Sequence, residues 1–206
     1  MTSNNYEMAP WKIVLASKSP RRHELLWNLG VEFSLYVAEA DEDYPADLPM
    51  RMVPSFLSEK KARAVLPNLK FNELLITADT VVIAGNQIFG KPADEAEAIE
   101  MLKHLSGNMH EVVTGVTICS RERMTTFSEL TRVYFKQLPT ELIEYYVSNY
   151  KPLDKAGAYG VQDWIGLSGI EKINGCFYNV MGLPTSRLME ELHKFGWNLE
   201  FRKQED

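Results

Sequence analysis

The sequence lacks the features that mark secreted, membrane-spanning and nucleic-acid-binding proteins. Its two cysteines, Cys119 and Cys176, lie far apart within apolar stretches, which suits reduced core residues better than a disulfide framework or a metal knuckle. No apolar run is long enough to span a bilayer, and residues 1–10 lack the basic and apolar regions of a signal peptide. The net charge of −6, from 22 basic and 28 acidic residues, argues against a nucleic-acid-binding surface. We therefore expect a cytoplasmic protein that binds neither nucleic acid nor membrane.

The rest of the composition is that of a globular protein. The chain has 206 residues, and 45% of them are hydrophobic, which is enough to bury a sizeable core in one domain or two closely packed lobes. We expect a polar extension over residues 1–10 and a single domain over residues 11–206. The four histidines show no paired metal-ligand spacing, so we expect them at the surface or at helix caps. They are His23, His104, His110 and His193.

The chain begins its first apolar segment at residues 12–16, which predict a strand. A helix is expected directly after it, because Ser19 is a good N-cap and Pro20 a good first helical residue. Leucines then recur at helical spacing until Gly30, which is expected to end the helix. The segment therefore predicts a strand that leads straight into the N-terminus of a helix.

Four side chains at this helix start predict an anion-binding site. Ser17 and Ser19 precede the helix, and Arg21 and Arg22 occupy its first turn. A helix N-terminus carries partial positive charge, so two arginines there are unfavourable unless an anion lies between them. Two solvated surface arginines would give the same pattern, and both interpretations stay open at this stage.

The stretch from Leu15 to Leu26 resembles the N-terminal signature of the Maf family of nucleoside triphosphate pyrophosphatases. Later segments extend the resemblance over nearly all of residues 11–206. The resemblance implies an α/β fold of the Maf/ITPase-like type, with a mixed central sheet flanked by helices and a cleft between two lobes. It also implies a homodimer.

A run of acidic residues follows the second expected strand. Glu39, Asp41, Glu42 and Asp43 repel one another, and a divalent cation would relieve that repulsion, although a solvated acidic loop gives the same run. The resemblance implies that Glu42 is the metal-associated glutamate, and Asp41 beside it remains the alternative.

A single carboxylate interrupts the most apolar segment of the chain. Residues 74–83 predict a central buried strand, and Asp79 is the one charged residue within it. A buried carboxylate is costly unless it is paired, hydrogen-bonded or bound to a metal. Asp79 is therefore a candidate for the site, although an aspartate where a strand breaks into a turn would look the same.

Two lysines gain significance from the resemblance. A helix is expected over residues 50–65, in which Lys61 matches a phosphate-binding lysine of the family and Lys60 is the alternative. Lys91, held between Gly90 and a proline, matches the family's substrate lysine. Without the family, all three are ordinary surface lysines. The expected buried face of the helix consists of Val53, Phe56, Leu57 and Ala64.

The second half of the chain is expected to be scaffold around one ligand-binding loop. Strands are predicted at residues 111–119 and 130–135 with a polar loop at 121–126, and a last strand and turn at 175–184 before a helix that ends at His193. The glycine-punctuated segment 152–162 resembles the Maf segment that holds the nucleotide. Within it, Gln162 matches the base-proximal glutamine.

The resemblance implies hydrolysis of a nucleoside triphosphate at the α-phosphorus, with release of pyrophosphate. Asp79 would accept a proton or bind the metal, Glu42 would be the second carboxylate, and Lys91 would assist catalysis. Arg21, Arg22 and Lys61 would neutralise charge on the phosphates. The expected cofactor is Mg²⁺, with Mn²⁺ or Co²⁺ as alternatives.

Three positions predict the base. Arg21, Thr80 and Gln162 agree with the family members that resemble dTTP and UTP pyrophosphatases, whereas those resembling 7-methyl-GTP pyrophosphatases carry tryptophan, glutamine and glutamate there. A glutamine amide can pair with the O4 and N3–H edge of thymine or uracil. Two other functions remain open: a phosphohydrolase that cleaves another nucleotide bond, and a nucleotide-binding regulator without hydrolysis.

Overall fold

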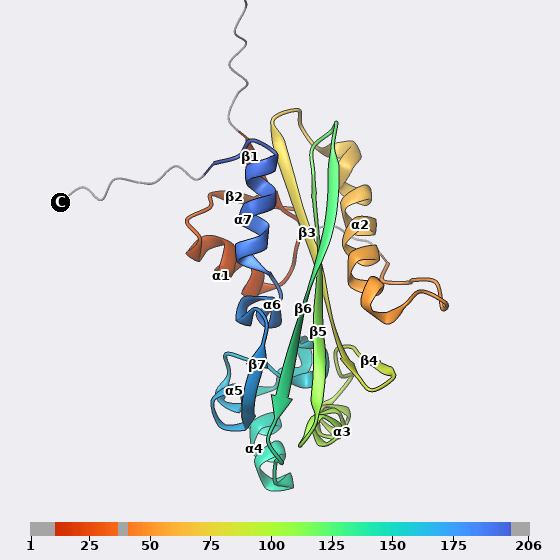
Figure 1. Ribbon diagram of the computed structural model, residues 1–206, viewed down its shortest axis with the longest axis vertical. Coiled ribbons are helices and arrows are strands. Elements are labelled where there is room, and N and C mark those ends of the chain that lie inside the picture. The colour runs from red at the N-terminus through yellow and green to blue at the C-terminus, as the bar shows by residue number, and fades with distance from the viewer. Residues whose placement is uncertain (1–10, 37–40, 199–206) are drawn as a thin grey trace, which may run out of the picture.

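The structure is a computed structural model, and it describes residues 11–36 and 41–198 (Figure 1). The expected extension over residues 1–10 lies outside the described residues. The described strands are β1 Lys12–Leu15, β2 Phe33–Leu35, β3 Glu73–Ala84, β4 Gln87–Phe89, β5 Met109–Cys119, β6 Met124–Phe135 and β7 Ile170–Asn174. The described α-helices are α1 Pro20–Asn28, α2 Val53–Val65, α3 Glu95–Leu105, α4 Thr140–Tyr150, α5 Trp164–Gly169, α6 Phe177–Met181 and α7 Thr185–Lys194.

One mixed sheet organises the described part of the chain. Its seven strands follow the order β2-β1-β3-β5-β6-β7, and β4 pairs with β3 outside this path. β2, β1 and β3 are parallel, whereas every other pair is antiparallel. The predicted α/β fold with a mixed central sheet flanked by helices is confirmed.

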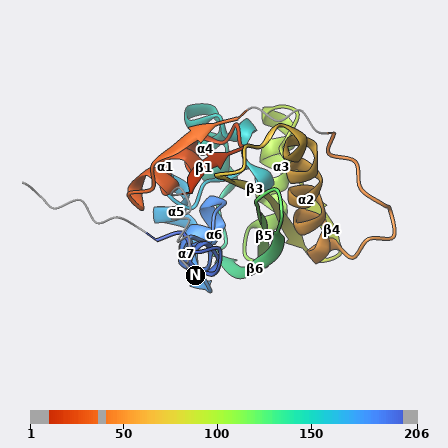
Figure 2. The same ribbon diagram turned by 90° about the horizontal axis from the view of Figure 1, so that it is seen from above.

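Helices cover both faces of the long central strands β3, β5 and β6. Figures 1 and 2 show α2 on one face, with α1, α6 and α7 on the other. Because side chains alternate along a strand, β3 sends Leu74 and Ile76 into the large core beneath α1 and α7, and Leu75 into the smaller core beneath α2. The same alternation places Asp79 and Thr80 on opposite faces of the sheet.

A gap in strand pairing exposes one edge of β3. On this edge, β1 pairs with residues 73–76 and β4 pairs with residues 82–84. No described strand pairs with the intervening residues 77–81 on that side, while β5 pairs with all of them on the other. A ligand can therefore approach both faces of β3 at this one place.

Local details of the fold follow from the residues at each position, and the expectation of free cysteines is confirmed. The hairpin turn between β3 and β4 contains Gly85 with φ of +58°, a conformation that glycine adopts at little cost. Asp94 caps α3 by accepting a hydrogen bond from the N–H of Glu97. Cys119 is buried, and both Cys119 and Cys176 are free thiols. None of the helices formed by the described residues is long and apolar enough to cross a membrane.

Other predictions are wrong. Phe56 and Ala64 are exposed, because α2 turns Ser58 and Ala62 toward the sheet in their place. Residues 124–126 belong to β6 and pair with β5, so the predicted polar loop is shorter than expected. The segment 175–184 contains the short helix α6, and the last strand is β7 before it. His110 is buried with 1% exposure, not at the surface or a cap.

Candidate active site

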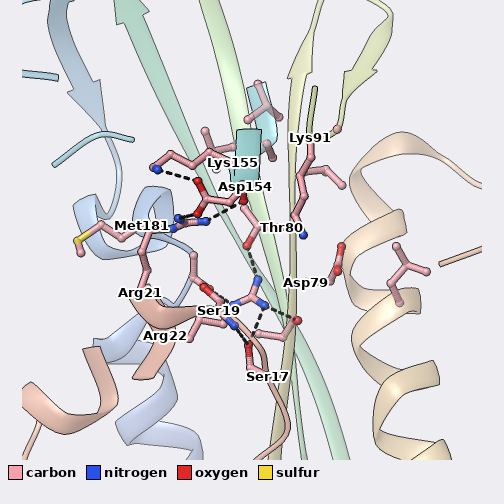
Figure 3. Close-up of a pocket in the computed structure, with 18 of the residues that line it drawn as sticks. Ser17, Ser19, Arg21, Arg22, Asp79, Thr80, Lys91, Asp154, Lys155 and Met181 are labelled. Carbon is pink, nitrogen blue, oxygen red and sulfur yellow. Dashed lines mark hydrogen bonds and ion pairs between the residues drawn. The ribbon is translucent and has the colours of Figure 1, made fainter. Parts of the chain in front are cut away.

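A cavity of about 1040 Å³ lies at the unpaired edge of β3. It is lined by the start of α1, the inner side of α2, both faces of β3 and the loop that follows α4 (Figure 3). It therefore brings together segments from the first, second and last thirds of the chain. Its basic lining residues are Lys18, Arg21, Arg22, Lys61, Lys91 and Lys155, and its acidic ones are Asp41, Glu42, Asp79 and Asp154.

On the α2 side of β3, one lysine joins two carboxylates. The Lys61 ammonium donates to Asp79 at 2.6 Å and to Glu42 at 3.1 Å. Asp79 and Lys61 are only 14% and 16% exposed, so their pair is well shielded from water, whereas Glu42 is open to solvent. The charge of Lys61 lowers the pKa of Glu42, which burial opposes. Asp79 is thus a paired strand carboxylate, as its sequence context required.

The distance between α2 and the sheet depends on a glycine. Gly115 lies opposite Asp79 in β5, and a Cβ added there would come within 2.3 Å of the Pro54 carbonyl carbon in α2. Deeper in the same interface, the Thr77 hydroxyl donates to the Ser58 carbonyl at 2.7 Å. The absence of a side chain at position 115 lets α2 pack closely enough for Lys61 to reach Asp79.

On the other side of β3, hydrogen bonds from Arg22 join α1 to the sheet. Its guanidinium donates to the Ala78 carbonyl at 2.9 Å, the Thr80 hydroxyl at 2.9 Å and the Gly182 carbonyl at 2.8 Å, with a longer contact of 3.5 Å to Ser17. The Ala78 carbonyl belongs to the unpaired edge of β3, so Arg22 supplies a donor that a neighbouring strand would otherwise provide. Burial lowers the pKa of Arg22, which the nearby Asp79 opposes.

Arg21 points to a different partner. It donates to the Asp154 carboxylate at 2.5 Å and to the Asp154 carbonyl at 3.3 Å, and Lys155 donates to the same carboxylate at 2.8 Å. Burial opposes ionisation of Asp154, but the two cations prevail and lower its pKa to about 2. This ion pair links the start of α1 to the glycine-rich loop, residues 152–162, along the wall of the cavity (Figure 3).

The N-terminus of α1 opens into the cavity. Ser19 precedes the helix but makes no side-chain capping bond, and its backbone N–H donates to the Ser17 hydroxyl at 3.1 Å. Lys18 between them lines the cavity, is exposed and has no ion-pair partner among the described residues. The first turn of α1 therefore presents backbone N–H groups to the cavity, beside the Lys18 ammonium, which forms no ion pair within the described chain.

The remaining predicted residues also line the cavity. Lys91 is exposed and forms no direct ion pair within the described part of the chain, although its charge helps to lower the pKa of Glu42. Gln162 is exposed on the glycine-rich loop. That loop is held against the sheet because Gly157, at φ of +70°, packs on Val82 and its N–H donates to the Gly90 carbonyl at 3.0 Å.

The balance of charge favours an anionic ligand. Six basic and four acidic side chains line the cavity of a chain whose net charge is −6. The described residues contain no group of three or more His, Cys, Asp and Glu side chains that could hold a metal by themselves. Glu42 and Asp79 both accept a hydrogen bond from the Lys61 ammonium, so their carboxylates lie close together. Mg²⁺ is commonly bound by one or two carboxylates together with waters and substrate phosphates, and these two carboxylates fit that pattern.

The structure places all the predicted site residues in this cavity, together with the alternative Asp41, and gives the alternatives different contacts. Lys61 forms an ion pair with Asp79, whereas Lys60 forms a separate ion pair with Asp41. Glu42 is the carboxylate that shares Lys61 with Asp79, while Glu39 lies outside the described residues. The predicted residues are Ser17, Ser19, Arg21, Arg22, Glu42, Lys61, Asp79, Thr80, Lys91 and Gln162.

Three charged cavity residues are not among the predicted site residues: Lys18, Asp154 and Lys155. Asp154 was part of the glycine-rich segment, but nothing in its local sequence indicates a partner 133 positions away. Lys18 lies inside the anion-binding stretch between two predicted serines, and its charge was a signal that could have been used.

Comparison with known proteins supports one family. A family model described as Maf-like protein matches residues 12–195. A dTTP/UTP pyrophosphatase of Cytophaga hutchinsonii is 50% identical over 182 residues, covering 88% of this chain and 83% of the relative. Proteins of the same name from Parabacteroides distasonis and Flavobacterium johnsoniae are 47% and 42% identical, each over 90% of this chain and 96% of the relative.

Proposed function

This chain belongs to the Maf family, and we propose that it hydrolyses dTTP and UTP to the nucleoside monophosphate and pyrophosphate. The observation that carries the proposal is the cavity, in which Asp79 and Lys61 lie beside the residues that match the pyrimidine subgroup. The relatives named dTTP/UTP pyrophosphatase support the same substrate.

The triphosphate would lie among the cavity's basic side chains. Lys18 and Lys91 are free of carboxylate partners in the described chain, and the open N-terminus of α1 adds backbone donors. Arg22 commits four of its N–H groups to protein acceptors, so it would act mainly through its charge and one remaining donor. These groups would stabilise negative charge that grows on the leaving pyrophosphate.

Asp79 is the proposed proton acceptor for the attacking water. Its carboxylate lies on the cavity wall and is held in place by Lys61, which also joins it to Glu42. A carboxylate in hydrogen-bond reach of a water can take its proton as the phosphorus is attacked. Attack at the α-phosphorus would transfer the water oxygen to the monophosphate and leave pyrophosphate as the second product, and the relatives' name, dTTP/UTP pyrophosphatase, supports this product.

We also propose that a divalent cation takes part. Glu42 and Asp79 would hold it, and Mg²⁺ is the expected ion, with Mn²⁺ or Co²⁺ as alternatives. Bound there, the ion would supply positive charge next to the phosphates and polarise a water. The homodimer implied by the resemblance and the cytoplasmic location expected from the sequence stay predictions.

Base selection is proposed to depend on Arg21, Thr80 and Gln162. All three line the cavity, and Arg21 is oriented by its bonds to Asp154. Gln162 is exposed to the cavity with an amide that can both donate and accept, which matches the O4 and N3–H edge of uracil or thymine.

Phosphorus NMR of the reaction products tests the proposal. Wild type with Mg²⁺ is expected to release pyrophosphate from dTTP and UTP, and much less from 7-methyl-GTP. Asp79→Asn is expected to lose this activity, whereas Asp94→Asn, which removes a carboxylate but keeps a good N-cap of α3 outside the cavity, is expected to retain it. Orthophosphate as the product would refute α-attack, and binding without turnover would favour a nucleotide-binding regulator.

A further inference from the structure

We propose that the buried residue Thr114 is a positioning residue that turns the Thr80 hydroxyl into an obligatory hydrogen-bond acceptor for the nucleoside. The inference rests on the proposed function, because it concerns how that cavity selects its substrate. Thr80 lines the cavity, whereas Thr114 is fully buried behind it and does not line it.

Three hydroxyl and carbonyl groups form a chain that leads away from the cavity. Thr80 and Thr114 are directly opposite each other in β3 and β5, and their hydroxyl oxygens are 2.9 Å apart. The Thr114 hydroxyl is also 3.1 Å from the backbone carbonyl of Asn179 in α6. At the other end, the Arg22 guanidinium donates to the Thr80 hydroxyl at 2.9 Å.

The number of hydrogens fixes the direction of this chain. A carbonyl oxygen only accepts, so the single hydrogen of Thr114 must point to Asn179 if that bond is made. The bond between the two threonines then needs the hydrogen of Thr80. The opposite arrangement would leave Thr114 without a bond to Asn179, at a site with no exposure to water. Thr80 therefore donates to Thr114, and Thr114 donates to Asn179.

Both ends of the chain are held rigidly. The Asn179 side chain donates to the Val112 carbonyl at 3.1 Å and to the Thr131 hydroxyl at 3.0 Å, and Asn179 is fully buried. Arg22 is fixed by the Ala78 and Gly182 carbonyls. Neither end can rotate to reverse the chain without losing hydrogen bonds.

The consequence for the cavity is a hydroxyl that cannot donate. The Thr80 hydroxyl donates its hydrogen to Thr114 and accepts a hydrogen bond from Arg22 with one lone pair. Its second lone pair is therefore the group that can bind a ligand. A ligand group near Thr80 must then be a donor. In dTTP and UTP the available donors are N3–H, which Thr80 would share with the Gln162 amide oxygen, and the sugar hydroxyls. Cytosine carries an acceptor at N3, which would face the Thr80 lone pair unfavourably, and its base donor is the 4-amino group at the neighbouring position.

Thr114→Val tests this, because valine keeps the shape of threonine and removes the acceptor that holds the Thr80 hydrogen. The kcat and KM are measured for UTP, CTP, dTTP and 2′,3′-dideoxy-TTP. If N3–H is the donor, the ratio of kcat/KM for UTP over CTP is expected to fall about 2- to 10-fold, which corresponds to the usual free-energy contribution of one hydrogen bond. If the sugar hydroxyl is the donor, the ratio for dTTP over its dideoxy analogue falls instead.

Two control variants separate positioning from loss of packing. Thr114→Ser keeps the hydroxyl and is expected to restore both wild-type ratios. Thr117→Val removes an equally buried hydroxyl from the same strand, where Thr117 contacts Ser58 beneath α2, and is expected to leave both ratios unchanged. Melting curves show whether each variant folds, and Thr114→Ala replaces Thr114→Val if the latter does not.

Unchanged ratios in a folded, active Thr114→Val or Thr114→Ala variant would overturn the inference. Failure of the proposed function would look different, since wild type itself would then release no pyrophosphate from UTP. In that case the same variants are compared by calorimetric binding of UTP and CTP, where equal affinity ratios in wild type and variant would again overturn the role of Thr114.

Discussion

Acid should destabilise the protein through one buried histidine. His110 is 1% exposed, and its ring packs edge-on against Phe135 and Tyr159 with centroid distances of 5.2 and 5.3 Å. Its Nε2 is 2.7 Å from the Tyr159 hydroxyl, while Nδ1 has no hydrogen-bond partner among the described residues. A second proton on this ring would be buried beside two aromatic rings, and no carboxylate among residues 11–36 and 41–198 forms an ion pair with the ring to offset its charge.

The size of the effect follows from the pKa. Burial lowers the pKa of His110 from 6.5 to about 4. Above pH 6.5 neither state binds the extra proton, so stability is unaffected. Between pH 6.5 and 4 the unfolded chain binds the proton and the folded protein does not, so stability falls as the pH falls. At about 1.4 kcal/mol per pH unit the full loss is about 3 kcal/mol, of which about 2 kcal/mol is lost by pH 5.

Urea unfolding at pH 7.5 and pH 5 measures this loss. Wild type and His110→Gln are compared at both values, because the other histidines are present in both proteins and cancel in the double difference. His110→Gln is expected to be less stable at pH 7.5, since it loses the ring contacts, but to lose about 2 kcal/mol less than wild type between the two values. A variant that loses as much stability as wild type over this interval would refute the assignment.

Three further changes test the cavity. Gly115→Ala is expected to cost about 1–3 kcal/mol in urea unfolding and to lower kcat, because a Cβ there would collide with Pro54 and push α2 away. Asp154→Asn, which removes the charge that orients Arg21 but keeps its bond to the backbone carbonyl, is expected to raise KM for UTP about 10-fold with little change in melting temperature; an unchanged KM would show that Arg21 needs no such charge. Lys91→Met is expected to lower kcat about 100-fold, and a change in KM alone would exclude a transition-state role.

The sequence identified residues whose chemistry conflicts with their local setting. Asp79 was found because a charge in an apolar strand needs a partner, and the structure provides Lys61. Arg21 and Arg22 were found because cations at a helix start are unfavourable. In each case an energetic conflict within a few residues marked the candidate, while its expected role came from the resemblance to the Maf family.

Partners that are distant in sequence could not be predicted in this way. Arg22 binds the carbonyls of Ala78 and Gly182, which are 56 and 160 positions away, and backbone carbonyls have no sequence signature. The same reason explains the error at α6, where a short apolar and aromatic segment favours a strand. Its helical form is anchored by Asn179, whose side chain bonds to Val112 and Thr131 in the neighbouring strands.

The cavity contains basic side chains of two kinds, some in ion pairs with carboxylates and some without such a partner in the described chain, and the two kinds would contribute differently to binding. Arg21 and Lys61 are held in position by the carboxylates of Asp154 and Asp79. A phosphate must compete with Asp79 for Lys61, which lowers the net contribution of Lys61 to affinity, whereas the position of Arg21 depends on Asp154. Lys18 and Lys91 have no such partner in the described chain and can meet the phosphates without breaking an ion pair. Lys18 and Lys91 would therefore attract the triphosphate, while Arg21 and Lys61 would hold fixed positions that orient it. In this way a protein with a net charge of −6 can bind a highly charged anion without a strongly positive surface.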